Sequence, residues 1–168
     1  KDTRPTTDRI KETLFNIIQM DVPRASFLDL FAGSGAIGLE ALSRGANEAV
    51  FVEKDPKAAA CLARNAAALD AESRCRILAE DVLRITARRP AAPFQVIFID
   101  PPYGESLFSP TLKNILRQNW LSENGFLIAE VEKGLRLNAE KQPGLSLISD
   151  DLYGQTRVIL WTSSHDQE

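Results

Sequence analysis

Short apolar runs alternate with helical patterns along most of this chain, and this alternation constrains the fold more than any other feature of the sequence. The apolar runs predict strands at residues 26–31, 49–53, 75–79, 95–100 and 126–131. Strands that are separated by helices form a parallel sheet, and near-continuous apolar strands indicate that helices cover both of its faces. The sequence therefore predicts an α/β fold with a mostly parallel sheet.

The segments between these strands carry the signals of helix starts and turns. The helix expected at residues 7–19 has an inward face made of Ile10, Leu14, Ile17 and Ile18, and its N-cap is Thr6 or Thr7. Asp55-Pro56 and Ser109-Pro110 each combine an N-cap residue with proline at the first helical position. Asn124-Gly125 predicts a turn before the fifth strand.

The last two strands are expected at residues 145–149 and 157–162. The chain between them, around Tyr153-Gly154, is too short for a helical crossover, so this pair should be antiparallel. A hairpin at this end fits the seven-stranded, Rossmann-like methyltransferase fold better than a plain dinucleotide-binding fold. In such sheets the ligand binds outside the carboxyl ends of the strands. We expect a single domain over residues 1–168, because this length supports one ordinary core.

The composition excludes several classes of function. Twenty Lys and Arg against 23 Asp and Glu give a net charge of −3, so the chain is not a basic coat for bare nucleic acid. No apolar run approaches the ~18 residues that a membrane span needs. Cys61 and Cys75 lack the spacing of metal ligands and indicate a reducing, cytoplasmic environment. We therefore expect neither a metal site nor a membrane partner.

A glycine-rich segment follows the first expected strand. Residues 33–38, GSGAIG, match the pattern G-x-G-x-x-G through Gly33, Gly35 and Gly38. The glycines let a ligand approach the backbone, and the helix N-terminus offers free N–H groups. Glu53, at the end of the second strand, would hold the hydroxyls of a ribose. These features fit NAD as well as S-adenosylmethionine (SAM), and a turn without a ligand is a third interpretation.

Two further acidic residues favour SAM. Asp29 lies inside the first strand, where a carboxylate is costly to bury without a partner such as the ammonium of a methionine moiety. Asp81 follows the third strand and can accept from an adenine amino group, or it can cap the next helix; each role needs one oxygen. Because SAM carries a sulfonium, an acidic pocket suits its charge.

The most specific signal is Asp100-Pro101-Pro102-Tyr103, which follows the fourth strand. The two prolines fix φ and remove two N–H donors, so this segment presents carbonyls. The Asp100 carboxylate and the Pro101 carbonyl can both accept from one exocyclic amine, and Tyr103 can stack on the ring that carries it. Such contacts would localise the lone pair of the amine and orient it toward a methyl donor. The alternative is a turn that ends the strand, with Asp100 as a cap.

These segments, with RPTTDRIKETLFN, VFVEKD and YGQTRV, resemble the RsmD family of bacterial SAM-dependent methyltransferases over nearly the whole chain. The resemblance implies a Rossmann-like class I methyltransferase fold, with helices on both faces of a mostly parallel seven-stranded sheet. It also implies methyl transfer to the exocyclic N2 of a guanine in 16S ribosomal RNA, either free or within the small ribosomal subunit. The residues it assigns to SAM are Asp29, Gly33, Gly35, Glu53 and Asp81, and those it assigns to the target amine are Asp100, Pro101, Pro102 and Tyr103.

One segment of the family pattern is expected to be missing. Family members usually carry a basic N-terminal β-hairpin ahead of RPTTD, and this chain starts after that point. We expect it to bind SAM and to bind RNA poorly, unless a surface around Arg84, Arg88 and Arg89 supplies the RNA contact. Arg4 and Thr6 either face the substrate or only brace the first helix.

Two other functions are compatible with the motifs. A DNA adenine or a protein glutamine could accept the methyl group at such a site. However, a DNA enzyme usually needs a separate recognition domain, and a glutamine enzyme more typically has Asn where Asp100 stands. A nucleotide-binding Rossmann module without methyl transfer would explain the glycines and Glu53, but it would leave Asp29 and residues 100–103 without a role.

Overall fold

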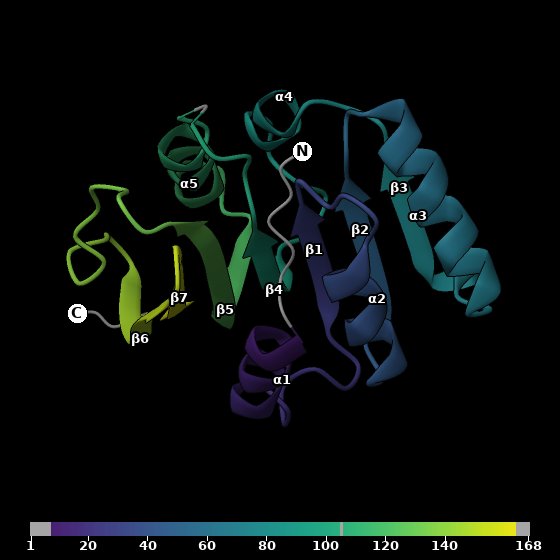
Figure 1. Ribbon diagram of the computed structural model, residues 1–168, viewed down its shortest axis with the longest axis horizontal. Helices are drawn as coiled ribbons and strands as arrows, with labels where there is room; N and C mark the ends of the chain where they lie inside the picture. Colours follow the sequence, from purple (N-terminus) through teal and green to yellow (C-terminus); the bar gives the residue numbers. More distant parts are fainter. Residues whose placement is uncertain (1–7, 105, 164–168) are drawn as a thin grey trace.

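Seven strands form one mixed sheet in the computed structural model, which describes residues 8–104 and 106–163 (Figure 1). The strands are β1 (Ser26–Leu30), β2 (Glu48–Val52), β3 (Cys75–Leu78), β4 (Phe94–Ile99), β5 (Leu121–Glu132), β6 (Leu145–Tyr153) and β7 (Thr156–Ser163). Their order is β3-β2-β1-β4-β5-β7-β6; the first five are parallel, and β7 pairs antiparallel with both β5 and β6. The predicted fold class is confirmed.

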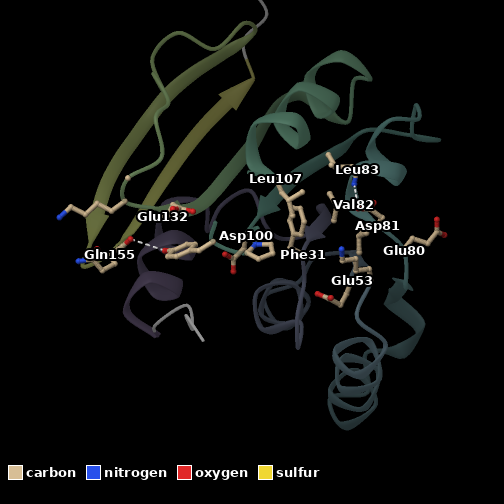
Figure 2. Close-up of a pocket in the computed structure, with 16 residues that line it drawn as sticks. Phe31, Glu53, Glu80, Asp81, Val82, Leu83, Asp100, Leu107, Glu132 and Gln155 are labelled. Carbon is tan, nitrogen blue, oxygen red and sulfur yellow. Dashed lines mark hydrogen bonds between the residues drawn. The ribbon is translucent and has the colours of Figure 1, made fainter. Parts of the chain in front are cut away.

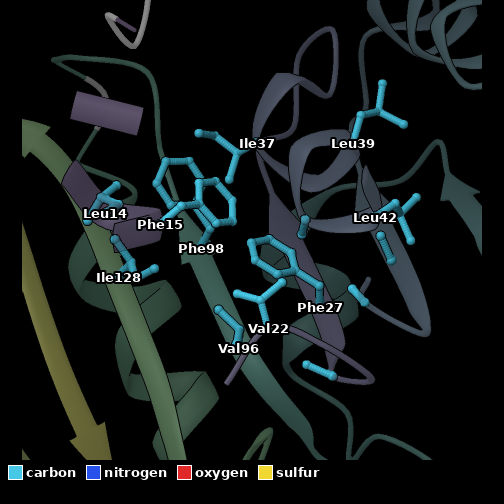
Figure 3. Close-up of a cluster of buried hydrophobic side chains, with 14 of the residues drawn as sticks. Leu14, Phe15, Val22, Phe27, Ile37, Leu39, Leu42, Val96, Phe98 and Ile128 are labelled. Atoms are coloured by element: carbon cyan, nitrogen blue, oxygen red, sulfur yellow. The ribbon is translucent and has the colours of Figure 1, made fainter. Parts of the chain in front are cut away.

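The helices lie on both faces of this sheet. They are α1 (Asp8–Ile17), α2 (Ala36–Ser43), α3 (Pro56–Ala68), α4 (Val82–Thr86) and α5 (Phe108–Arg117), with a short 3-10 helix η1 (Glu72–Arg74). Because successive strand residues point to opposite faces, Phe27 packs with α1, α2 and α3, whereas Leu28 packs with α4 and α5. Figure 3 shows the first cluster, which includes the buried rings of Phe15, Phe27 and Phe98. Burial on both faces explains the near-continuous apolar strands.

The first helix differs from its prediction in the face that it buries. Phe15 is 1% exposed, whereas Ile17, which we expected inside, is 45% exposed. The buried stripe runs over Ile10, Leu14, Phe15 and Ile18, so Ile17 lies at its edge. Arg44 covers the Phe15 ring at 4.8 Å, which completes the burial of the larger side chain. The expected caps Thr6 and Thr7, like Arg4, lie outside the described residues.

The two proline-based helix starts have different outcomes. Asp55 caps α3 as predicted: its side chain accepts from the Lys57 backbone N–H at 3.2 Å, and Pro56 is the first helical residue. The predicted cap at Ser109 is wrong, because α5 begins at Phe108, two residues before the expected first helical residue Pro110, and no side chain caps it. Pro110 is accommodated in the first turn, where helical N–H groups have no intrahelical partner.

The predicted turn at Asn124-Gly125 is also wrong, because both residues lie inside β5. Asn124 has a φ of 62°, and the pairing register of β4 with β5 shifts between Phe94 and Val96. The left-handed residue thus makes an irregularity of the bulge kind within a continuous strand. Beyond it β5 runs to Glu132, so the strand extends from the far end of the sheet to the edge where the candidate site lies.

Candidate active site

A cavity of about 1110 Å³ opens at the carboxyl ends of the parallel strands (Figure 2). The lining residues are Phe31, Val52, Glu53, Lys54, Glu80, Asp81, Val82, Leu83, Asp100, Pro102, Tyr103, Leu107, Glu132, Lys133, Gly134 and Gln155. They come from the ends of five neighbouring strands, from the start of α4, from the loop before α5 and from the turn that joins β6 to β7. The cavity spans the point where the strand order reverses, between β1 and β4, which is where open α/β sheets bind ligands.

The loop between β1 and α2 borders this cavity in an unusual backbone conformation. Phe31, Gly33 and Gly35 all have positive φ, of 61°, 59° and 86°. Of these three residues, Phe31 lines the cavity. A positive φ is uncommon for a residue other than glycine. Gly33 and Gly35 lie outside the lining, so they shape the loop that a ligand would approach.

Glu53 joins this loop to the end of β2. Its Oε1 accepts from the Gly33 backbone N–H at 2.7 Å, and its Oε2 accepts from the Asp55 backbone N–H at 3.0 Å. Each carboxylate oxygen has two lone pairs, so both oxygens can still accept a further hydrogen bond from a ligand. Glu53 also lines the cavity, which agrees with the predicted ribose contact.

Asp29 lies beneath the glycine loop and outside the cavity lining. The side chain is 1% exposed, and its Oδ2 accepts from the Gly38 backbone N–H at 3.1 Å. Burial raises the pKa of Asp29 well above its usual range; the Gly38 hydrogen bond lowers the pKa, and the charges of Asp100 and Glu53 raise it further. Asp29 therefore caps the first turn of α2 from below, at an electrostatic cost that a cationic ligand nearby would reduce.

This raised pKa predicts how the stability of the chain depends on pH. The folded chain binds the Asp29 proton more tightly than the unfolded chain, so the free energy of unfolding falls as pH rises from 3.8 through the raised pKa. Asp29→Asn cannot ionise, yet its amide oxygen can still accept from Gly38. We expect the stability advantage of Asp29→Asn over the unchanged protein to increase with pH in urea denaturation. An advantage that does not change with pH would contradict the assignment.

The third glycine of the motif is needed for close packing between α2 and the sheet. A Cβ at Gly38 would overlap Cε2 of Phe51 and would lie 2.8 Å from its Cζ. Since Phe51 is completely buried, its ring has little room to move. We expect Gly38→Ala to destabilise the chain by about 1–3 kcal/mol, as overpacking does. Chemical denaturation measures this loss. Gly134→Ala is the matched control, because nothing lies within 4 Å of its added Cβ, and an equal loss there would refute the packing explanation.

Asp81 serves as an N-cap and also lines the cavity. Its Oδ1 accepts from the Leu83 backbone N–H at 3.1 Å, at the first turn of α4. The structure thus shows one of the two roles that the sequence left open for Asp81, that of a helix cap. Asp81 also lines the cavity, and one capping bond uses only part of the acceptor capacity of its carboxylate. The same side chain can therefore also accept a hydrogen bond from an adenine amino group.

The segment from Asp100 to Tyr103 forms the opposite wall. Asp100, Pro102 and Tyr103 line the main cavity, and Pro101 lines an adjoining cavity of about 140 Å³ that shares Pro102 and Tyr103. The Asp100 backbone N–H donates to the Leu30 carbonyl at 3.4 Å, which ties the start of the segment to the end of β1. The structure therefore brings the segment predicted for the amine and the residues Glu53 and Asp81 to the same cavity.

The C-terminal hairpin braces this segment. The Tyr103 hydroxyl lies 3.0 Å from Oγ1 of Thr156 and 3.4 Å from the carbonyls of Val131 and Gln155. The hydroxyl is thus held at the ends of β5 and β7, while the ring lines the cavity. The sequence predicts a stacking role for Tyr103 and does not indicate this anchor.

The charge of the cavity favours a cationic ligand. Five carboxylate residues line it, against two lysines: Glu53, Glu80, Asp81, Asp100 and Glu132 against Lys54 and Lys133. A sulfonium and an ammonium group fit this donor set, whereas two phosphates would meet repulsion. Among the described residues no cluster of His, Cys, Asp and Glu could hold a metal ion. In the same part of the chain no helix is long and apolar enough to cross a membrane.

Most of the other lining residues had no predicted role in the site. Phe31 lies in the predicted strand 26–31 and Gln155 lies in YGQTRV, whereas Leu107 and Glu132 belong to no quoted motif. Phe31 and Glu132 could have been found by one available signal, because each lies at the carboxyl end of a parallel strand, as Glu53 does. Leu107 and Gln155 reach the cavity from a loop and a hairpin turn, and sequence pattern alone does not indicate such positions.

The sheet order and the place of this acidic site at the switch point are those of the Rossmann-like class I methyltransferase fold, and relatives named as rRNA methyltransferases place the chain among the SAM-dependent enzymes of that fold. Residues 1–162 match the model of the family described as Conserved hypothetical protein 95. The chain belongs to this family, which is the RsmD family that its sequence resembles.

Individual relatives agree with this assignment. Ribosomal RNA small subunit methyltransferase D of Escherichia coli is 41% identical over 135 residues, which are 79% of this chain and 67% of that protein. The protein of the same name in Haemophilus influenzae is 37% identical over 77% of this chain and 68% of its own length. A solved structure of a conserved hypothetical protein from Streptococcus pyogenes has a TM-score of 0.84 at 31% identity, covering 92% of this chain and 95% of that one.

Proposed function

We propose that this chain transfers the methyl group of SAM to the exocyclic N2 amine of a guanine in 16S ribosomal RNA. The observation that carries the proposal is one continuous cavity with Glu53 and Asp81 on one side and Asp100, Pro102 and Tyr103 on the other. A methyl donor held by the first pair would face an amine held by the second group. The names of the relatives from Escherichia coli and Haemophilus influenzae support the small-subunit RNA as the substrate.

The residues proposed for the cofactor fall into two groups, those that line the cavity and those that form or support the glycine loop. Glu53 and Asp81 line the cavity and would accept from the ribose and the adenine. Gly33 and Gly35 shape the loop above β1, and the buried Asp29 carboxyl accepts from the Gly38 backbone N–H beneath that loop. SAM, when bound here, supplies an electrophilic methyl group on a positively charged sulfur.

The residues of the opposite wall would orient the amine. Asp100 and the Pro101 carbonyl accept from the two N–H groups of N2, which directs the nitrogen lone pair toward the methyl carbon. The N–C bond then forms as the S–C bond breaks, and the sulfur retains the electron pair of the broken bond. One amine proton leaves through the Asp100 carboxylate to solvent, so the products are N2-methylguanine and S-adenosylhomocysteine.

The natural substrate is proposed to be the ribosomal RNA within the small subunit, in the bacterial cytoplasm. The test is transfer of labelled methyl from SAM to small subunits that lack the modification, followed by identification of the methylated nucleoside. N2-methylguanosine is the expected product. A DNA duplex and a glutamine-containing peptide serve as competing acceptors, and methyl transfer to either of them but not to the subunits would refute the proposal.

A further inference from the structure

Glu132 is a carboxylate of the cavity for which the proposed chemistry has no role so far. It is the last residue of β5, the strand next to β4, and Ile99 of β4 lies opposite Ala129 of β5. Asp100 therefore leaves the sheet beside β5 while that strand continues to Glu132. Both residues line the main cavity (Figure 2), and Glu132 also lines the adjoining cavity formed by Pro101, Pro102 and Tyr103.

The carboxylate of Glu132 is held in place by the segment that carries Asp100. Its Oε1 accepts from the Gly104 backbone N–H at 2.9 Å, directly after Tyr103. A carboxylate has about four acceptor sites, so this bond orients the group and leaves capacity for another donor. The side chain is half-buried, where a hydrogen bond to a ligand is worth more than at a fully exposed position.

Tyr103 makes the arrangement rigid from the other side. Its hydroxyl contacts Thr156 at 3.0 Å and the Val131 carbonyl at 3.4 Å, and Val131 immediately precedes Glu132. Two contacts thus join the segment 100–104 to the end of β5, one through the phenol and one through the Gly104 N–H. Asp100 and Glu132 belong to one braced unit around the tyrosine ring.

We propose that Glu132 selects guanine by accepting a hydrogen bond from its N1–H, while Asp100 holds the adjacent N2 amine; this inference rests on the proposed function. On its Watson–Crick edge guanine presents N1–H and the N2 amine side by side, and both are donors. Adenine and cytosine present an unprotonated ring nitrogen next to their amine, which would repel a carboxylate. Uracil has an N–H donor but no amine. Two neighbouring carboxylates therefore fit guanine alone among the four RNA bases.

Glu132→Gln tests this inference because it changes the group that faces N1 of the base from a hydrogen-bond acceptor to a donor. Its amide oxygen can keep the bond from the Gly104 N–H, and its NH₂ then offers a donor where the carboxylate offered an acceptor. The substrates are small subunits whose target position, mapped beforehand, carries either guanine or 2-aminopurine. 2-Aminopurine keeps the N2 amine but has an unprotonated N1. We expect the substitution to lower the guanine rate about 10- to 100-fold and to shift the preference toward 2-aminopurine.

The ratio of the two rates separates base reading from bracing. Glu132→Ala is the matched control: it removes the carboxylate and the bond to Gly104 together, so it should slow methyl transfer and abolish the preference for guanine, whereas Glu132→Gln should reverse that preference. If Glu132→Gln slows both substrates by the same factor, Glu132 only braces the loop and the inference is refuted. If the unchanged protein methylates no guanine in these subunits, the proposed function itself fails and this inference fails with it.

Discussion

Asp100→Ala is expected to lower the rate of methyl transfer about 10²–10³-fold and to leave the affinity for SAM nearly unchanged. Asp100 lies at the end of β4, on the wall of the cavity opposite Glu53 and Asp81. Its loss would remove an acceptor that orients the amine while the proposed contacts to the cofactor stay in place. Single-turnover rates measure the chemical step, and calorimetry measures the affinity.

Asp100→Asn is the matched control for this prediction. Its amide oxygen can still accept a hydrogen bond, so this variant should retain more activity than Asp100→Ala. If Asp100 only ended the strand, activity and melting temperature would fall together in both variants. The Asp100 backbone N–H that donates to Leu30 is present in every variant, so the tie between β4 and β1 does not depend on the substitution. A normal rate in a stable Asp100→Ala protein would end the amine-site assignment.

The strand ends could be placed from the sequence because parallel strands that are buried on both faces have a strong apolar signal. Asp29 lies in β1, Glu53 follows β2, and Asp81 and Asp100 follow β3 and β4, as predicted. Since the carboxyl ends of parallel strands share one edge of the sheet, placing each acid on its strand also placed most of the site. No side-chain geometry was needed for this step.

The contacts of these residues could not be predicted, because they depend on distances of a few ångströms between distant parts of the chain. Glu53 bonds to Gly33, which lies twenty residues earlier, and Tyr103 bonds to Thr156, fifty-three residues later. Asp29 illustrates the limit: its place in β1 was predicted, but alternation in the strand turns it toward α2 and away from the cavity lining. The buried face of α1 was not fully predicted for the same reason, since the packing of Phe15 decides which side chains of this helix are buried.

Glu53→Ala is expected to weaken SAM binding by about 10- to 100-fold, because a hydrogen bond to a charged group is worth about 1.5–3 kcal/mol. The carboxylate lines the cavity at the end of β2, where the ribose diol is proposed to lie. However, the same side chain also accepts from the backbone N–H groups of Gly33 and Asp55. A lower affinity alone would therefore not distinguish a lost ligand contact from a disordered loop.

A ligand without the ribose hydroxyls separates these two causes. Calorimetry compares S-adenosylhomocysteine with its 2′,3′-dideoxy analogue, each against the unchanged protein and against Glu53→Ala. If Glu53 accepts from the diol, the substitution should cost about 10- to 100-fold for the natural ligand and much less for the analogue, because the lost bond was never made by the analogue. If Glu53 acts only by holding the Gly33 and Asp55 N–H groups, both ligands should lose the same factor. Equal losses would remove Glu53 from the cofactor site and leave it as a support of the glycine loop.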